Sequence, residues 1–162
     1  YAVGKLYGMT DAEIRNGLLN YKSDGIRQSI LDINGAKILN DCYNSSPQAA
    51  KSAIDVLKTL SNGRKIAVLG DMAELGEMSE KYHREVGAHF AKEKCDILVT
   101  VGNSARFIAD EAKKCGADEK NVHSFDSNAE VCAFLKGNLQ KGDAVLIKGS
   151  HCMKMDEISK NL

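Results

Sequence analysis

Hydrophobic and polar positions alternate along this chain with two spacings, one typical of helices and one typical of strands. The helical spacing comes first: Thr10 and Glu13 form a capping box, and apolar residues follow at helical spacing. Gly8, just upstream, is a common stop for a helix that precedes it. We therefore predict two short helices in the first 20 residues, the second beginning near Asp11.

The strand-like alternation follows in residues 25–33 and again in residues 36–40. Between them stands Asn34-Gly35, the dipeptide that most strongly signals a two-residue hairpin turn. The pattern thus predicts a β-hairpin that supplies one antiparallel edge of a sheet.

From Pro47 onward, helical and extended patterns alternate. Ser46 and Pro47 fit the N-cap and first position of a helix. Strands are predicted at 65–69, 96–101, 122–125 and 144–148, and further helices at 79–94, 104–114, 127–139 and 153–161. Such alternation favours a parallel sheet covered by helices. The predicted fold class is α/β: a Rossmann-like, open, mostly parallel sheet with helices on both faces and an antiparallel N-terminal hairpin edge.

Composition narrows the function classes. The 162 residues carry 22 Lys and Arg against 22 Asp and Glu, so the totals give no electrostatic footprint for nucleic acid or anionic lipid. No apolar run approaches the ~18 to 20 residues that span a bilayer, and no signal-peptide pattern is present. The five cysteines include no CxxC pair, which argues against a disulfide framework and a structural zinc site. We expect a cytoplasmic protein with mostly packed, reduced thiols, and a fragment of a longer one, because Tyr1 opens mid-pattern without an initiator Met.

Candidate chemistry is concentrated in four turns that follow predicted strands, at residues 41–47, 70–76, 102–104 and 148–151. In an open parallel sheet, ligands bind beyond the carboxyl ends of the strands. If the strands are parallel, all four turns share one edge. The sequence therefore predicts one composite site built from segments that are far apart in the chain.

The first turn combines the Asp41 carboxylate, the Tyr43 phenol and the Asn44 amide ahead of a helix N-terminus. These groups suit ribose hydroxyls and a base. Ordinary capping of backbone donors by Asp41 and Asn44 is an equally open interpretation.

In the last turn, Lys148 ends a buried strand, Gly149 allows close backbone approach and Ser150 adds a hydroxyl. An anionic group could meet ammonium and hydroxyl together there. The alternative is a surface lysine beside a tight turn. The turn at 70–76 fits neither GxGxxG nor GxxxxGK[ST], so the chain lacks the usual loop for holding a γ-phosphate.

His83, with Glu80 and Glu85 nearby, invites a metal interpretation. His83 and His89 are six residues apart, however, and face different sides of their helix. We expect these residues on a solvated helix face and predict no metal site.

Four segments resemble, in order and spacing, the C-terminal domain of the Mur ligase family. They are Asn-Asp-Cys-Tyr-Asn-Ser-Ser-Pro at 40–47, Ala-Val-Leu-Gly-Asp-Met-Ala-Glu-Leu-Gly at 67–76, His83 with Val86-Gly87, and Leu-Ile-Lys-Gly-Ser at 146–150. Gly25-Ile26-Arg27-Gln28 is similar to the family's arginine motif. The resemblance runs from about Ala2 to the end, and the second and fourth segments are similar to the subfamily that adds D-alanyl-D-alanine.

The resemblance implies a bacterial, three-domain, ATP-dependent ligase of peptidoglycan synthesis. An N-terminal domain would bind the UDP-sugar, and a central domain would hold the phosphate loop and most of the Mg²⁺ site. ATP would phosphorylate the terminal carboxylate of a UDP-N-acetylmuramoyl-tripeptide, and the amine of D-Ala-D-Ala would attack the acyl phosphate and expel phosphate. This domain would close over ATP and position the dipeptide, with its own missing domains as partners. Alone it would be inactive, with no catalytic residue of its own.

Position by position, the resemblance implies two sets of contacts. The adenosine side of ATP would be contacted by Arg27, Asp41, Tyr43 and Asn44. The dipeptide would lie nearer to Asp71, Asn103, Lys148, Gly149 and Ser150. Residues 1–20 would be the tail of the central domain with its connecting helix, residues 21–162 the C-terminal domain, and 21–24 the hinge. Two alternatives stay open: a stand-alone nucleotide-binding or regulatory module of flavodoxin-like architecture, and a purely structural interaction domain.

Overall fold

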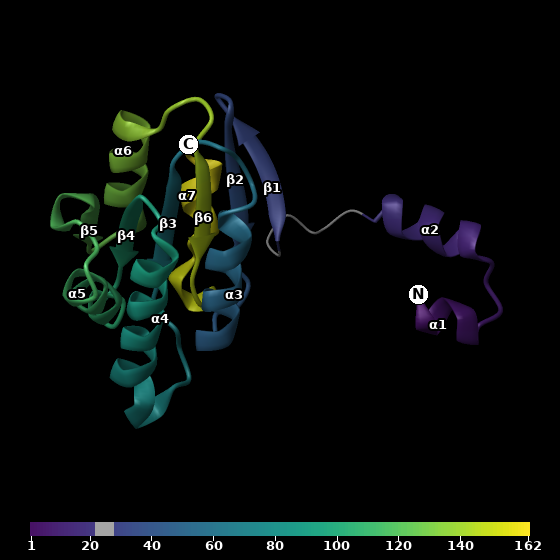
Figure 1. Ribbon diagram of the computed structural model, residues 1–162, viewed down its shortest axis with the longest axis horizontal. Helices are drawn as coiled ribbons and strands as arrows, with labels where there is room; N and C mark the ends of the chain where they lie inside the picture. The colour runs from purple at the N-terminus through teal and green to yellow at the C-terminus, as the bar shows by residue number, and fades with distance from the viewer. Residues whose placement is uncertain (22–27) are drawn as a thin grey trace.

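The computed structural model of the chain describes residues 1–21 and 28–162. Among these residues, six strands form one sheet in the order β1-β2-β6-β3-β4-β5. The strands are β1 (Ser29–Ile33), β2 (Ala36–Asp41), β3 (Lys65–Gly70), β4 (Ile97–Val101), β5 (Val122–Phe125) and β6 (Ala144–Lys148). All neighbouring pairs are parallel except β1 and β2. The predicted α/β class, with its antiparallel hairpin edge, is confirmed (Figure 1).

The hairpin turn has the backbone that its sequence demands. Asn34 and Gly35 have φ of 54° and 80°, the positive values that a two-residue turn needs to match the twist of its strands. Asp32 accepts a hydrogen bond from the Gly35 amide at 3.0 Å. The strand predicted from residue 25 is described only from Ser29, since residues 22–27 lie outside the described part of the chain.

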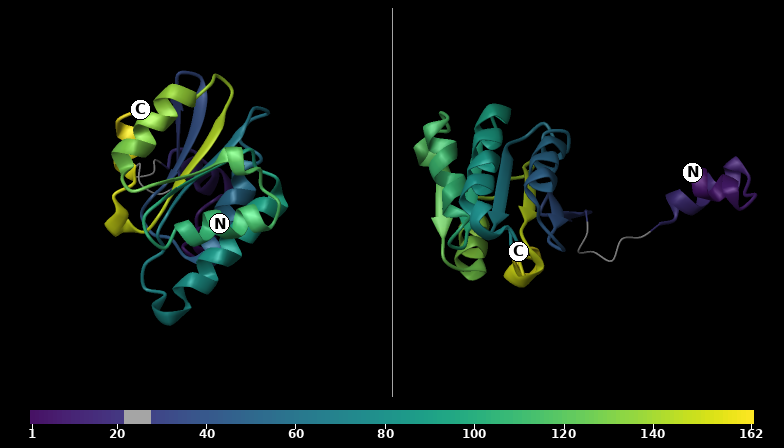
Figure 2. Two further views of the ribbon diagram at one scale, coloured as in Figure 1. Left: turned by 90° about the vertical axis from the view of Figure 1, so that its left-hand side faces the viewer. Right: turned by 90° about the horizontal axis from the view of Figure 1, so that it is seen from below.

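Helices cover both faces of the sheet (Figure 2). One face carries α3 (Pro47–Leu57), α4 (Ser79–Glu93) and α5 (Arg106–Lys114), and the other carries α6 (Asn128–Asn138) and α7 (Asp156–Lys160). Because strand side chains alternate, Ala67 and Leu69 of β3 join one apolar core cluster, and Ile66 and Val68 join the other. Each cluster fills the space between the sheet and one helix layer.

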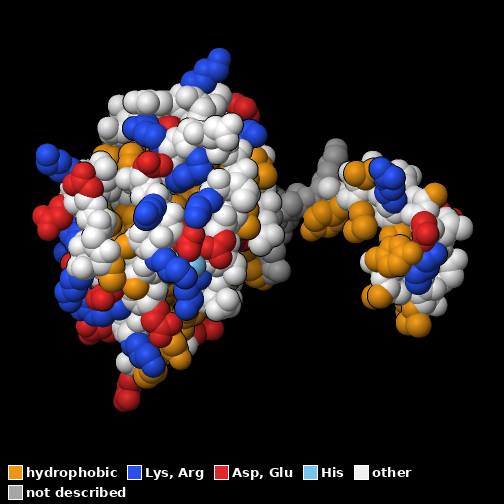
Figure 3. Space-filling view, viewed as in Figure 1, with side chains coloured by type: hydrophobic (Ala, Val, Ile, Leu, Met, Phe, Trp, Pro, Cys, Tyr) orange, Lys and Arg blue, Asp and Glu red, His pale blue; other side chains and the backbone are white. Residues whose placement is uncertain are grey.

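Two helices precede the sheet and lie apart from it, at the right of Figure 1. They are α1 (Ala2–Leu6) and α2 (Asp11–Leu19), and both bonds of the Thr10–Glu13 capping box are present. Ile14 is the one buried residue among them. Their other large apolar side chains are between 66% and 85% exposed, apart from Met9 at 40% (Figure 3): Tyr1, Val3, Leu6, Tyr7, Leu18, Leu19 and Tyr21. An apolar surface of this extent is typical of a face that another part of a protein covers.

Two predicted helix starts need correction, whereas the helix predicted from 79 begins at Ser79, directly after a 3-10 turn at Gly76–Met78. The helix predicted from 104 begins at Arg106, because Asp71 already accepts the Ala105 amide hydrogen bond. The helix predicted at 153–161 is shorter, Asp156–Lys160, and follows another 3-10 turn at 151–153.

Two expectations drawn from composition meet the structure as follows. Within the described residues, no helix combines the length and apolar character needed to cross a bilayer. All five cysteines are free; Cys42 and Cys132 are buried, Cys95 is half-buried, and Cys115 and Cys152 are exposed.

Candidate functional site

The four turns that follow β2, β3, β4 and β6 lie along one edge of the sheet. Register fixes this, because Asp41 is paired with Lys148, Lys148 with Leu69, and Gly70 with Val101. The expectation of a shared edge is confirmed. We call the turns at 41–47, 70–76, 102–104 and 148–151 the strand-end rim.

Lys148 is buried at the centre of this rim. Its ammonium donates to the Asp41 carboxylate at 2.7 Å and to the backbone oxygen of Asn44 at 2.8 Å. The side chains are only 2% and 13% exposed, respectively, for Lys148 and Asp41. The alternative of a surface lysine is therefore wrong. The two residues that the resemblance places on different ligands form one ion pair.

The alternative that these side chains satisfy backbone donors holds for Asn44, but neither Asp41 nor Asn44 caps helix α3. Ser46 is the N-cap, and its hydroxyl accepts from the Ala49 amide at 3.3 Å. The Asn44 side chain instead accepts from the Ser45 amide at 2.7 Å. Asp41 thus ties β2 to β6, while Asn44 shapes the turn itself.

Ser150 and Asp71 connect the second and fourth turns. The Ser150 hydroxyl accepts from the Ala73 amide at 2.8 Å, and the Ser150 amide donates to the Asp71 backbone oxygen at 3.0 Å. Ser150 is only 3% exposed, so its hydroxyl holds the 70–76 turn in place. A ligand would meet the backbone that Ser150 arranges more readily than the hydroxyl itself.

The Asp71 carboxylate also reaches the third turn. It accepts from the Ala105 amide at 2.7 Å, just before helix α5. Gly102, with φ of 107°, allows this approach, because a Cβ there would lie 2.6 Å from an Asp71 oxygen. Asn103, between them, is exposed on the rim.

His83 is where the sequence interpretation fails. It was expected on a solvated face, but it is 0% exposed. Its Nε2 accepts from the Met72 amide at 3.0 Å, and its Nδ1 lies 2.7 Å from the Ser79 backbone oxygen. Because an amide can only donate, the ring is the neutral tautomer protonated on Nδ1. The hydrogen bonds of His83 hold the turn that contains Asp71 against helix α4.

Gly149 and Gly70 make room for a side chain of the protein itself. A Cβ on either glycine would lie 2.3 Å from the Met155 sulfur. The two α-carbons are thereby covered by Met155. If Gly149 contacts a ligand, it does so through its backbone.

The rim encloses two adjoining hollows. One, of about 430 Å³, is lined by Tyr43, Asn44, Ala73, Glu74, Ser150, His151 and Cys152. The other, of about 490 Å³, is lined by Tyr21, Gln28, Asp41, Tyr43, Asn44, Ala49 and Lys148. Tyr43 borders both, is 43% exposed, and packs edge-on against His151 with ring centroids 5.8 Å apart. An amphipathic ring shared by two hollows suits a planar heterocycle.

Sequence reasoning assigned no role to several residues that line the hollows, among them Glu74, His151 and Cys152 in the first one. Glu74 adopts a φ of 63°, which is uncommon for a non-glycine residue and often marks a functional turn. The signal for Glu74 was available, since it lies within the Gly-Asp-Met-Ala-Glu-Leu-Gly segment. Arg27, predicted to contact ATP, lies outside the described residues.

Comparison with known proteins assigns the chain to a family. The family described as "Mur ligase, glutamate ligase domain" matches residues 27–151. The chain belongs to this family. The resemblance recognised in the sequence is thereby confirmed.

Individual Mur ligase relatives are longer than this chain. The UDP-N-acetylmuramoyl-tripeptide–D-alanyl-D-alanine ligase of Bacillus subtilis (strain 168) is 36% identical over 163 residues, which cover 99% of this chain and 35% of that protein. The crystal structure of a MurF ligase from Thermotoga maritima in complex with ADP is 27% identical, with a TM-score of 0.81 over 99% of this chain and 35% of that one. A MurF structure from Acinetobacter baumannii gives 26% identity and a TM-score of 0.83 over 96% of this chain and 34% of that one. The chain thus spans about a third of the length of these relatives.

Proposed function

We propose that this chain is the C-terminal domain of an ATP-dependent amide-bond ligase that adds D-alanyl-D-alanine to a UDP-N-acetylmuramoyl-tripeptide in peptidoglycan synthesis. The observation that carries the proposal is the strand-end rim of a Mur ligase domain: its four turns share one edge of the sheet, and three of them, at 41–47, 70–76 and 148–151, line two hollows that share Tyr43. The relative from Bacillus subtilis bears the name of this ligase.

The proposed contacts fall into two sets. Arg27, Asp41, Tyr43 and Asn44 would contact the adenosine side of ATP, and a relative from Thermotoga maritima was crystallised with ADP. Asp71, Asn103, Lys148, Gly149 and Ser150 would lie nearer the dipeptide. In this division Lys148 acts mainly through Asp41, Ser150 through the 70–76 turn, and the exposed Asn103 directly.

The reaction itself would take place between domains. ATP phosphorylates the tripeptide carboxylate, the amine of D-Ala-D-Ala attacks the acyl carbon, and the tetrahedral intermediate collapses by breaking the C–O bond to phosphate. Closing this domain over the acyl phosphate would align the amine and keep water out. The γ-phosphate loop and the Mg²⁺ site would be supplied by the portion of the relatives that this chain does not span. Alone, the chain would release no phosphate.

Residues 1–20 would belong to the end of the preceding domain, and residues 21–162 to the C-terminal domain. The exposed apolar side chains of α1 and α2 support this division, since another domain would cover them. We keep the cytoplasmic location as a prediction that follows from this function.

The test uses the full-length gene product. Phosphate release should require ATP, UDP-N-acetylmuramoyl-tripeptide and D-Ala-D-Ala together, and should drop to background with L-Ala-L-Ala. Tyr43→Ala should raise KM for ATP about tenfold through lost stacking on the base, with KM for the dipeptide unchanged. Asn103→Ala should do the reverse, and Asp126→Asn, on an exposed ion pair, should alter neither.

Equal phosphate release with both dipeptides would remove the substrate assignment. The alternative function, a stand-alone nucleotide-binding module, predicts micromolar nucleotide binding by the 162-residue chain without partner domains, measured by calorimetry.

A further inference from the structure

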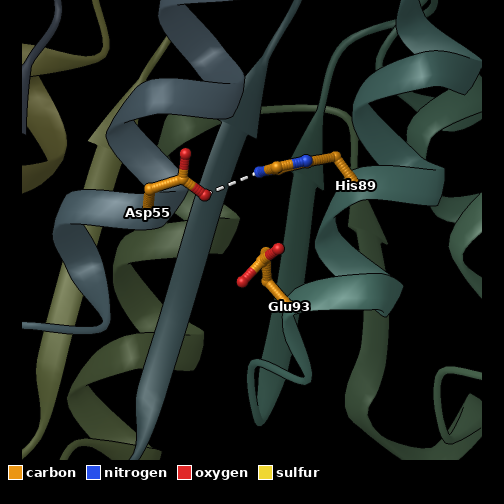
Figure 4. A group of neighbouring side chains, drawn as sticks. All are labelled: Asp55, His89 and Glu93. Atoms are coloured by element: carbon orange, nitrogen blue, oxygen red, sulfur yellow. Dashed lines mark hydrogen bonds and ion pairs between the residues drawn. The ribbon is translucent and has the colours of Figure 1, made fainter.

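A second cluster of ionisable side chains lies between helices α3 and α4, away from the strand-end rim. It consists of Asp55, His89 and Glu93, whose ligand-type atoms all lie within 4.8 Å of one another. Figure 4 shows the three side chains converging on the space between the two helices. Since α3 and α4 both start near the strand ends and run back along the sheet, residues near their C-terminal ends lie toward its opposite edge.

Local geometry explains why the three side chains meet. His89 and Glu93 are four residues apart, which places them on one face of α4. Asp55 comes from α3, which packs against α4. The His89 Nε2 lies 2.7 Å from an Asp55 carboxylate oxygen, so the imidazole nitrogen that would ligate an ion already faces a carboxylate.

We propose that Asp55, His89 and Glu93 bind a divalent transition-metal cation such as Zn²⁺ or Co²⁺. One imidazole and two carboxylates match the ligand preferences of these ions, whereas Mg²⁺ and Ca²⁺ favour oxygen ligands alone. The ion would replace the His89–Asp55 hydrogen bond, with the His89 proton carried on Nδ1. Water would complete the coordination on the open side, where the Asp55 side chain is 56% exposed.

Lys58 is the competitor for this ion. Its ammonium lies 2.7 Å from Glu93 Oε2. A carboxylate has two oxygens, so one can face an ion while the other keeps the lysine, and the Lys58 side chain is 43% exposed and free to swing away.

An ion at this position would fasten α3 to α4. Binding to the folded chain alone raises its melting temperature, by about 5 to 10 °C at a hundredfold excess over Kd. The cluster is separate from the strand-end rim, so its metal binding can be measured whether or not the proposed ligase function is correct.

The experiment is titration of the chain with CoCl₂ and with ZnCl₂. We expect one ion bound per chain, a visible Co²⁺ absorption band that Zn²⁺ removes, and a raised melting temperature that a chelator reverses. His89→Gln and Asp55→Asn should abolish all three responses. His123→Gln and His151→Gln, which change histidines outside the cluster, should keep them.

Lys58→Met is the most specific test, because metal binding at an unrelated surface site would not change in this variant. Removing the competing ammonium should tighten Co²⁺ binding about two- to fivefold. The proposal is overturned if neither ion shifts the melting temperature, if the shift survives in His89→Gln, or if Lys58→Met leaves the affinity unchanged or weakens it.

Discussion

Replacing Asp41 by Asn removes one charge from the most buried ion pair of the strand-end rim. The substitution keeps the size of the side chain and leaves the Lys148 ammonium without its counter-charge. Lys148 is 2% exposed and cannot regain water without moving the end of β6. Its remaining acceptor among the described residues is the Asn44 backbone oxygen at 2.8 Å.

The expected cost follows from the desolvation of the stranded charge. Breaking a buried pair by removing one partner lowers the free energy of unfolding by about 3 to 5 kcal/mol. Lys148→Met should cost less, about 2 kcal/mol, because the Asp41 carboxylate it leaves is 13% exposed and reaches solvent. The double variant removes both charges, so its loss should fall short of the sum by about 2 kcal/mol.

Urea unfolding of the four proteins, followed by circular dichroism at neutral pH, measures this cycle. Asp126→Asn is the matched control, because Asp126 pairs with Arg106 at 2.6 Å but the side chains are 76% and 53% exposed. The control should change stability by less than about 0.5 kcal/mol. Additive effects of Asp41→Asn and Lys148→Met, or a cost for Asp41→Asn no larger than the control's, would refute the assignment of a buried, mutually dependent pair.

Three further predictions concern the residues that hold the turns and the sheet in place. Burial would raise the pKa of Asp143, but hydrogen bonds from Arg64 and a backbone amide outweigh it and lower the pKa below its ordinary 3.8. The stabilisation from the Asp143 carboxylate is present above pH 3.8 and is lost as the pH falls through the lower pKa of the folded state. Arg64→Met should therefore lower the free energy of unfolding by about 3 kcal/mol near pH 7 and by progressively less below pH 4, measured by urea titrations. Gly102→Ala should lower the free energy of unfolding by about 1 to 3 kcal/mol, since the backbone φ at residue 102 is 107° and the new Cβ would collide with the Asp71 side chain. An unchanged melting temperature would contradict this. His83→Ala should lower the free energy of unfolding by about 3 to 4 kcal/mol, because it leaves a cavity and an unpaired Met72 amide. Thermal unfolding measures this loss, and a loss below about 1 kcal/mol would show that the His83 contacts are not needed for stability.

Features encoded by neighbouring residues were predictable from the sequence. The Asn34-Gly35 turn and the Thr10–Glu13 capping box form as predicted, because the residues that make each one are at most three positions apart. The shared edge of the strand-end rim was also predictable, since helix and strand alternation imposes parallel strands.

The burial of Lys148 depends on contacts across the sheet that no local pattern contains. Its partner Asp41 is 107 positions away, and the two meet only because β6 is inserted between β2 and β3. Helix and strand alternation implies parallel strands but leaves their order open. The same limit applies to Gly70, because the Met155 side chain that lies against it comes from a segment far along the chain.

His83 could have been placed correctly from its spacing. Together with Val86, Gly87 and Phe90 it forms an i, i+3, i+4, i+7 series, and all four are buried on α4. This spacing, rather than the chemistry of the imidazole, predicts that His83 is buried. His89 lies six positions on, which turns it away from the sheet and toward α3, where Asp55 meets it.

The contacts within the rim divide its residues into two classes, and the division can be measured. The rim residues Lys148 and Ser150, together with His83 from helix α4, make their hydrogen bonds within the protein, so they fix the backbone against which a ligand would rest. Tyr43 and Asn103 are exposed, and their side chains can reach a ligand directly. Variants of the first class should lose stability and ligand affinity together, whereas Tyr43→Ala and Asn103→Ala should raise KM at unchanged melting temperature. The proposed ligase would need such a rigid backbone, because its closing domain would have to align an amine with a short-lived acyl phosphate. Full activity in variants that lack these buried contacts would contradict that role for the rim.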